Sequence, residues 1–287
     1  MADHKDLSTF HEPVSDLFKN QGALVPLELS QEQLAAFQRD GFITNVPLLT
    51  PEQCDTLCEE LAEFLQPAHE GFEYWYEYHT NESTTPETAL FHALGAWRLR
   101  PGFHDLLWNP ALVGTSRQLL QAEPRFWHDQ LFCKPAHHGG VVAWHQDYSY
   151  WTRTEPMQHL TCWIPLDDCD AENGSIQYVP GSHRWELLPK TELAGDMEGI
   201  RALLDDEQWE ALSNPTVVNS RRGHATFHHP LTVHGSQANK SSRPRRATVV
   251  NLVADGVCSM SDEPLLEGVP PIPRGEPLGG QFFPLLG

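Results

Sequence analysis

The stretch Trp144-His145-Gln146-Asp147-Tyr148 decides how the fold of this sequence is interpreted. It places an imidazole and a carboxylate two positions apart, inside a region rich in Trp, Val, Ile, Tyr and Thr that is typical of strands. Side chains at positions i and i+2 of a strand point to the same face of the sheet. We therefore expect His145 and Asp147 to converge on one metal ion from a rigid support.

A third metal ligand must come from elsewhere in the chain, and one histidine-rich stretch offers it. This stretch is Phe227-His228-His229-Pro230-Leu231-Thr232-Val233-His234-Gly235-Ser236. Two His and one carboxylate that leave open positions form the facial arrangement that suits non-haem Fe(II) oxygenases. The sequence therefore predicts an iron site built from two distant segments.

An arginine follows this stretch at the start of another predicted strand. Arg245 lies eleven residues after His234 and precedes the strand-like run Ala247-Thr248-Val249-Val250. A fixed cation beside the metal could hold a dicarboxylate cosubstrate through a bidentate pair with its distal carboxylate. The hydroxyl of Ser236 could donate a further hydrogen bond to the same carboxylate.

The rest of the chain predicts an α+β fold with a mainly β core. Capping boxes at Ser30 and Thr50 begin two helices, within a helical N-terminal part of about 28–122 that includes a third helix at about 103–121. About eight short strands follow over 126–256, interrupted by a helical insertion at about 190–213. The tail 259–287 is rich in Pro and Gly, which predicts either an ordered coil on the surface or a loose tail. We expect one domain over 1–287.

Composition narrows the function classes. The 19 Lys and Arg against 39 Asp and Glu give a net charge of −20, which argues against a nucleic-acid groove. No apolar stretch approaches the roughly 18 residues that span a bilayer. The six cysteines form no CxxC pair, and the charged N-terminus is not followed by an apolar run, so we expect free thiols and a cytoplasmic protein. Sixteen histidines are more than this metal site uses.

Taken together, the sequence resembles the phytanoyl-CoA dioxygenase family of Fe(II)- and 2-oxoglutarate-dependent oxygenases. The motifs that carry the resemblance are Lys134-Pro135, Trp144-His145-Gln146-Asp147, Asn173-Gly174-Ser175, Val179-Pro180-Gly181-Ser182-His183 and His234-Gly235-Ser236 with Arg245. The resemblance implies a double-stranded β-helix with N-terminal helices. It also implies that His145, Asp147 and His234 bind iron, that Arg245 and Ser236 anchor 2-oxoglutarate, and that Trp163 and Gln130 line the cosubstrate.

Rival residues exist for two of these roles. His228 and His229 compete with His234, but they point to opposite faces of a strand and lack the Gly-Ser that follows His234. Arg243 and Arg246 compete with Arg245, and the spacing typical of the family favours Arg245. A cupin-like isomerase or hydrolase with the same metal ligands, and a barrel that only binds, are alternative functions.

The resemblance implies O2-dependent hydroxylation of a substrate, with release of succinate and carbon dioxide. Asp147 favours oxygenation, because halogenating relatives carry a small residue at this position. Aromatic residues are expected either to form the wall of a pocket for a small organic molecule or to belong to the core; they are Tyr74, Trp75, Tyr148, Tyr150 and Trp151. The aromatic segment within 66–90 is either a lid over this pocket or a surface loop. The acidic chain disfavours a CoA thioester as substrate.

Overall fold

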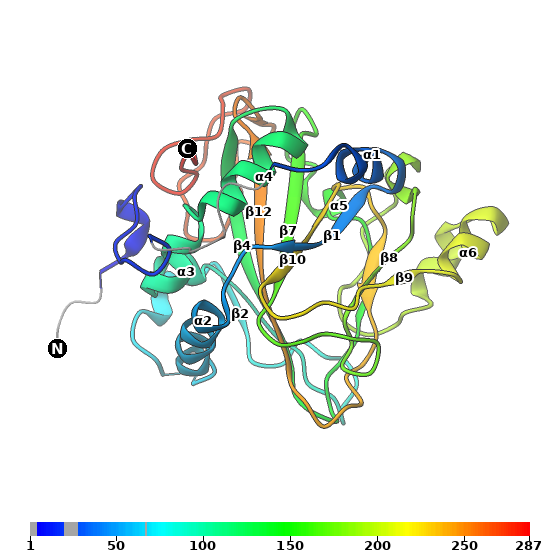
Figure 1. Cartoon of the computed structure of the whole chain (residues 1–287). Helices are drawn as coiled ribbons and strands as arrows, with labels where there is room; N and C mark the ends of the chain where they lie inside the picture. The colour runs from blue at the N-terminus through cyan, green and yellow to red at the C-terminus, as the bar shows by residue number, and fades with distance from the viewer. Residues whose placement is uncertain (1–4, 20–27, 67) are drawn as a thin grey trace.

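The larger of two facing antiparallel sheets carries most of the fold (Figure 1). The computed structural model describes residues 5–19, 28–66 and 68–287, so the first four residues of the charged N-terminus lie outside the described residues. The larger sheet has the strand order β1-β10-β7-β12-β4-β3-β2. Its strands are β1 (Phe42–Pro47), β2 (Glu77–His79), β3 (Phe91–Leu94), β4 (Pro124–Lys134), β7 (His159–Pro165), β10 (His224–His228) and β12 (Arg245–Ala254).

The smaller sheet has the order β5-β11-β8-β9, and a separate pair joins β13 to β6. These strands are β5 (Val142–His145), β6 (Thr154–Glu155), β8 (Ile176–Tyr178), β9 (Thr216–Val217), β11 (His234–Ser236) and β13 (Cys258–Ser259). A buried cluster joins the two sheets, and within it the rings of Phe42 and Tyr178 stack at 4.5 Å between centroids. Two sheets packed over a shared core confirm the predicted double-stranded β-helix with helices.

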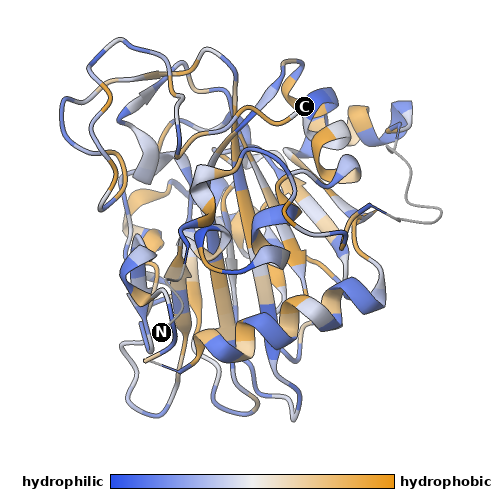
Figure 2. Cartoon of the chain, turned by 90° about the vertical axis from the view of Figure 1, so that its left-hand side faces the viewer, coloured by the Kyte–Doolittle hydropathy of each residue, from blue (hydrophilic) through white to orange (hydrophobic). Residues whose placement is uncertain are grey.

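The helices α2, α3 and α4 pack against the larger sheet, whereas α6 packs near the smaller one. The helices of the described chain are α1 (Gln31–Asp40), α2 (Pro51–Phe64), α3 (Pro101–Leu106), α4 (Pro110–Leu120), α5 (Tyr148–Trp151) and α6 (Asp206–Leu212), with 3-10 turns at Leu7–Thr9, Phe72–Tyr74, Ala96–Arg98, Ser182–Arg184 and Gly199–Leu203. The helix α4 contacts β4, β7 and β12. Figure 2 shows helices in front of the strands, carrying both hydrophobic and hydrophilic residues. A large apolar core fills the space between helices and sheet.

The two predicted N-terminal helices are confirmed, together with their start signals. Ser30 and Thr50 each accept a hydrogen bond from the backbone three residues on, and the glutamine there bonds back to the cap. Gly41 ends α1 with a φ of 86°, which glycine adopts without strain. The helix α2 buries Leu57 and Leu61 on one face, as its apolar spacing predicts.

Other element boundaries differ from the prediction. The helix expected at 103–121 is two helices, because Pro110 restricts the residue before it and Asn109 caps the second helix by accepting from two backbone amides. The range 28–122 also contains β1, β2 and β3 of the larger sheet. Within the expected insertion, only 199–203 and 206–212 are helical.

The C-terminal segment 259–287 is a coil that packs against the protein. Leu278, Phe283 and Leu286 are buried, and the backbone amide of Leu286 donates to the carbonyl of Pro124 at 2.9 Å. These contacts favour the ordered coil over the loose tail. All six cysteines are free thiols, as expected. In the part of the chain that the structure describes, no helix is both long and apolar enough to cross a membrane.

Candidate active site

Three predicted metal ligands meet at the open end of the smaller sheet. His145 ends β5 and His234 begins β11, and the two residues pair across the strands. The Nε2 atoms of His145 and His234 lie 3.4 and 3.5 Å from Oδ1 of Asp147. All three residues are buried, and one ligand atom from each lies within 4.8 Å of the others. This donor set and spacing suit one divalent transition metal.

The reason for this convergence differs from the one that the sequence indicated. The strand β5 ends at His145, and Asp147 has the helical dihedrals φ −57° and ψ −43° at the start of α5. Asp147 therefore reaches the site from a turn rather than from the same strand face as His145. The expectation of one continuous strand through 147 is wrong, although the two side chains do meet.

Hydrogen bonds orient both histidines for metal binding. The Nδ1 atom of His145 lies 2.8 Å from the carbonyl of Ala143, and the Nδ1 atom of His234 lies 2.9 Å from the carbonyl of Thr232. A carbonyl only accepts, so each Nδ1 carries the hydrogen and each Nε2 keeps its lone pair. Both lone pairs are on the nitrogens that face Asp147. Second hydrogen bonds of this kind are typical of metal-binding histidines.

The carboxylate of Asp147 is also held so that one oxygen stays free. Its Oδ2 accepts from Oγ1 of Thr161 at 2.6 Å and lies 3.0 Å from Nε2 of His228. Burial raises the pKa of Asp147, but the facing His234, His145 and His228 outweigh burial and hold that pKa well below its usual range. Asp147 is therefore an anion whose Oδ1 points at the two histidines.

Sequence reasoning treated His228 as a rival ligand and did not single out Thr161. The structure places His228 beside the site, where its Nδ1 lies 2.9 Å from the hydroxyl of Tyr178 and its Nε2 contacts Asp147. Thr161 lies two residues before Trp163 on β7 and so shares its face. Counting this alternation outward from Trp163 would have identified Thr161.

A buried cation lies at the other end of the same cavity. Arg245 is only 2% exposed and contacts two neutral oxygens, the hydroxyl of Ser236 and the carbonyl of Phe132, both at 3.4 Å. Its Nε atom is buried without a hydrogen-bond partner among the described residues, and its guanidinium lies 5.9 Å from the centre of the Trp163 ring. A buried, under-satisfied guanidinium that lines a cavity fits a carboxylate ligand.

The rival arginines are engaged elsewhere. Arg243 forms an exposed ion pair with Asp170 at 2.5 Å, and Arg246 pairs with Asp167 at 2.6 Å. Arg246 is next to Arg245 on β12, so its side chain points to the opposite face. Arg245 is the one of the three that lines the cavity.

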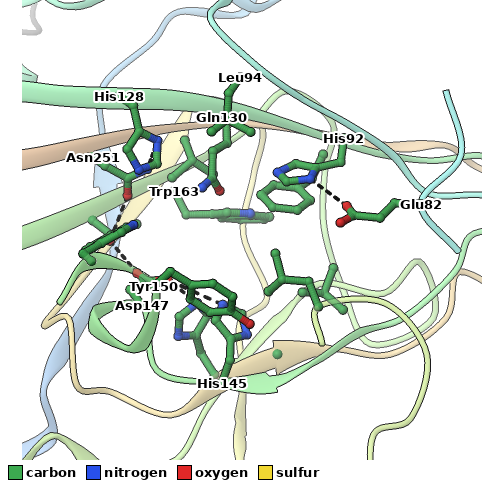
Figure 3. Close-up of a pocket in the computed structure, with 18 of the residues that line it drawn as sticks. Glu82, His92, Leu94, His128, Gln130, His145, Asp147, Tyr150, Trp163 and Asn251 are labelled. Atoms are coloured by element: carbon green, nitrogen blue, oxygen red, sulfur yellow. Dashed lines mark hydrogen bonds and ion pairs between the residues drawn. The ribbon is translucent and has the colours of Figure 1, made fainter. Parts of the chain in front are cut away.

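The metal ligands and the buried arginine share one cavity of about 720 Å³. This volume is within the range of roughly 300–1,000 Å³ that suits small molecules. Figure 3 shows Tyr150 beside His145 and Asp147, with Gln130 and Trp163 on the opposite wall. The cavity also reaches the predicted aromatic residue Trp151 and the leucines 265 and 266 of the C-terminal coil.

Three of the five predicted aromatic residues do not line the cavity. Tyr148 belongs to the core, and its hydroxyl donates to the carbonyl of Thr154 at 2.7 Å. Trp75 packs edge-on against the ring of Phe64, and Tyr74 packs beside the same core. For Tyr74, Trp75 and Tyr148 the structure therefore favours the core over the cavity wall, the second of the two expected places. The segment 66–90 borders the cavity through its polar residues 77, 82 and 84 instead.

Comparison with known proteins agrees with this geometry. The model of the phytanoyl-CoA dioxygenase (PhyH) family matches residues 37–247. The chain belongs to this family. The PhyH domain-containing protein 1 of Bos taurus is 27% identical to it, over 85% of this chain and 97% of that protein. The ectoine dioxygenase of Halomonas elongata is 30% identical, over 76% of this chain and 68% of the relative.

Solved structures share the fold of this PhyH protein. The non-haem alpha-ketoglutarate-dependent carbocyclase SnoK from nogalamycin biosynthesis superposes with a TM-score of 0.72 at 23% identity, over 91% of this chain and 97% of SnoK. EctD from S. alaskensis, solved with 2-oxoglutarate and 5-hydroxyectoine, gives a TM-score of 0.63 at 22% identity, over 85% and 82%. Family membership makes the protein a non-haem iron- and 2-oxoglutarate-dependent dioxygenase, and the cupin-like hydrolase and the non-catalytic barrel are set aside.

Proposed function

We propose that the protein hydroxylates a free small organic molecule, with Fe(II) held by His145, Asp147 and His234 and with 2-oxoglutarate anchored by Arg245 and Ser236. One observation carries the proposal. Three oriented ligand atoms and a buried, under-satisfied guanidinium lie in the same cavity. A hydrolase or isomerase with this metal set has no use for the buried cation, whereas a dicarboxylate cosubstrate needs it.

Bound iron, 2-oxoglutarate and oxygen together supply the oxidation, in which the cosubstrate becomes succinate and carbon dioxide and a C–H bond of the substrate becomes C–OH. The contribution of the chain is to position these groups. His145, Asp147 and His234 would hold the iron, and three protein ligands would leave coordination positions for the cosubstrate and oxygen. Arg245 and Ser236 fix the distal carboxylate, and Trp163 and Gln130 line the space between this anchor and the metal ligands.

The substrate side of the cavity is mostly apolar with a few polar groups. Tyr150, Trp151, Leu265 and Leu266 contribute its apolar lining. Burial lowers the pKa of His128 to about 4, so its imidazole is neutral near pH 7. Such a lining can hold an uncharged part of a substrate and can bond one of its polar groups.

The rim of the cavity argues against an acyl-CoA. Its charged side chains have both signs, namely Glu77, Glu192, Arg153 and Lys190. The guanidinium of Arg153 donates to the carbonyls of residues 264 and 265 of the C-terminal coil. No basic cluster among these rim residues matches several phosphates. Relatives named ectoine dioxygenase and L-proline trans-4-hydroxylase also bear the names of small amino-acid-like molecules.

The experiment that tests this function measures oxygen consumption and succinate release with Fe(II) and 2-oxoglutarate across a panel of metabolites and acyl-CoA esters. We expect a free small molecule to stimulate succinate release above the uncoupled background, together with one hydroxylated product per succinate. The His145→Ala variant serves as the matched control and should release none. Stimulation and hydroxylation of acyl-CoA esters alone would overturn the substrate class.

A further inference from the structure

Lys134 is a buried cation that the proposed function does not yet use. It ends β4, where it pairs in register with Arg245 at the start of β12. Its side chain is fully buried and does not line the cavity. The Nζ atom lies 2.6 Å from Oγ of Ser236, 2.6 Å from the carbonyl of Gln237 and 3.2 Å from the carbonyl of Ser236.

These contacts provide one acceptor for each hydrogen of an ammonium group, but they provide no negative charge to balance it. An ammonium has three hydrogens, and Lys134 has three oxygen acceptors around it. All three acceptors are neutral, and in the described part of the chain no carboxylate contacts Lys134. Arg245 beside it also contacts only neutral oxygens. Two adjacent buried cations without a counter-ion are costly, so the pair favours an anion in the cavity.

The same contacts determine where the hydroxyl hydrogen of Ser236 points. The ammonium form of lysine and the guanidinium of arginine donate and do not accept. The Oγ atom of Ser236 therefore accepts from Lys134 and from Arg245, and its own hydrogen must be directed away from both. Ser236 lines the cavity, so a ligand there is the remaining acceptor for this hydrogen.

We propose that Lys134 is a positioning residue of the cosubstrate site: it directs the hydroxyl hydrogen of Ser236 toward the distal carboxylate of the cosubstrate and adds a second buried positive charge behind Arg245. The proposal rests on the proposed function. Lys134 touches the serine rather than the ligand, so its effect is on selectivity for a 2-oxo acid that carries a distal carboxylate. Burial, followed by the charge of Arg245, lowers the pKa of Lys134, and a bound carboxylate opposes both effects.

The test compares two ligands that differ only at the distal end. 2-Oxoglutarate and 2-oxopentanoate share a five-carbon 2-oxo acid, and only the first has a distal carboxylate. Their dissociation constants are measured by anaerobic calorimetry on Mn(II)-loaded protein, where no turnover occurs. We expect Lys134→Met to raise the dissociation constant of 2-oxoglutarate about tenfold or more, since a charge-supported hydrogen bond is lost. The dissociation constant of 2-oxopentanoate should change less than about twofold.

A double-mutant cycle with Ser236→Ala tests whether Lys134 acts through the serine. We expect Lys134→Met to weaken the binding of 2-oxoglutarate less in the Ser236→Ala background than in the wild-type background. The Mn(II) affinity of each variant reports whether the metal site is intact. If Lys134→Met does not fold, Lys134→Gln keeps a donor for Ser236 without the charge, and it should show an intermediate loss confined to 2-oxoglutarate.

If Lys134→Met weakens the binding of both ligands equally, Lys134 has only a structural role. Unchanged affinity of this variant for 2-oxoglutarate would also overturn the proposal. The Arg245→Met variant separates this failure from failure of the proposed function. If Arg245→Met abolishes the preference for 2-oxoglutarate while Lys134→Met retains it, only the role of Lys134 is wrong. If Arg245→Met also retains the preference, the cosubstrate anchor itself is wrong.

Discussion

Thr161→Val is the most informative single change near the metal ligands. The hydroxyl of Thr161 donates to Oδ2 of Asp147 at 2.6 Å and also lies 3.0 Å from Oδ1 of Asn251. Valine has almost the same shape, so the change removes the hydrogen bond without leaving a cavity. Oδ2 keeps its contact with His228, so the carboxylate loses one of two partners. A hydrogen bond to a charged group contributes about 1.5–3 kcal/mol, and outer partners of metal ligands change metal affinity by roughly 10–100-fold.

We therefore expect Thr161→Val to weaken Mn(II) or anaerobic Fe(II) binding about tenfold, near the lower end of that range because His228 remains. Calorimetric titration of the metal-free protein measures this. Thr248→Val is the matched control, because Thr248 is equally buried on the neighbouring strand and its hydroxyl has no partner among the described residues. The control should leave metal affinity unchanged. Unchanged affinity in Thr161→Val, or equal loss in both variants, would refute the reasoning.

Three further predictions follow. Thr248→Val should raise the melting temperature, since it removes a buried hydroxyl without a partner; a lower melting temperature would contradict this. Tyr150→Phe should raise the KM for substrate, because the lost hydroxyl bonds the carbonyl of Thr191 and both residues line the cavity. Tyr148→Phe should lower thermal stability and leave KM unchanged, because Tyr148 belongs to the core; the reverse pattern would show that the two aromatic roles are exchanged. Asp105→Ala should lower the melting temperature at pH 7, because that carboxylate accepts from the backbone amides of Val14 and Ser15 and from the hydroxyl of Ser15, and it also contacts Nδ1 of His104.

The contribution of Asp105 to thermal stability also depends on pH. Burial raises the pKa of Asp105, but its bonds from His104, Ser15 and the backbone amide of Val14 outweigh burial and lower it overall. A carboxyl whose folded pKa lies below its unfolded value stabilises the protein above the unfolded pKa and loses that contribution as the pH falls. The difference in melting temperature between wild type and Asp105→Ala should therefore shrink below about pH 4. A constant difference down to pH 3 would contradict it.

The sequence was sufficient to predict the double-stranded β-helix and the meeting of His145, Asp147 and His234, but not the local backbone at these residues. His145 and Asp147 are spaced for one strand face, yet Tyr148–Trp151 forms a helical turn that begins at Asp147. Three of these four residues are aromatic and favour strands. Tertiary packing overrides that preference, because Tyr148 is held in the core by its bond to Thr154.

Residue type also does not tell which aromatic side chains line the cavity and which belong to the core. Trp75 and Trp151 have the same chemistry, and only the packing places Trp75 against Phe64 and Trp151 at the cavity. The supporting residues Thr161 and Lys134 lie on strands that the sequence indicated. Lys134 contacts Ser236, which is 102 residues further along the chain, and Thr161 contacts Asp147 at the start of α5, so both hydrogen bonds are visible only in the folded structure.

The measurement that tests the central claim most directly is anaerobic addition of Fe(II) and 2-oxoglutarate, followed by visible spectroscopy. We expect the wild type to give the weak charge-transfer band of the iron-bound 2-oxo acid. His145→Ala should give none because it loses the metal, and Arg245→Met should bind Fe(II) with unchanged affinity but need far more 2-oxoglutarate to develop the band. A wild type that binds Fe(II) without developing the band, or an Arg245→Met variant with unchanged affinity for 2-oxoglutarate, would contradict the account.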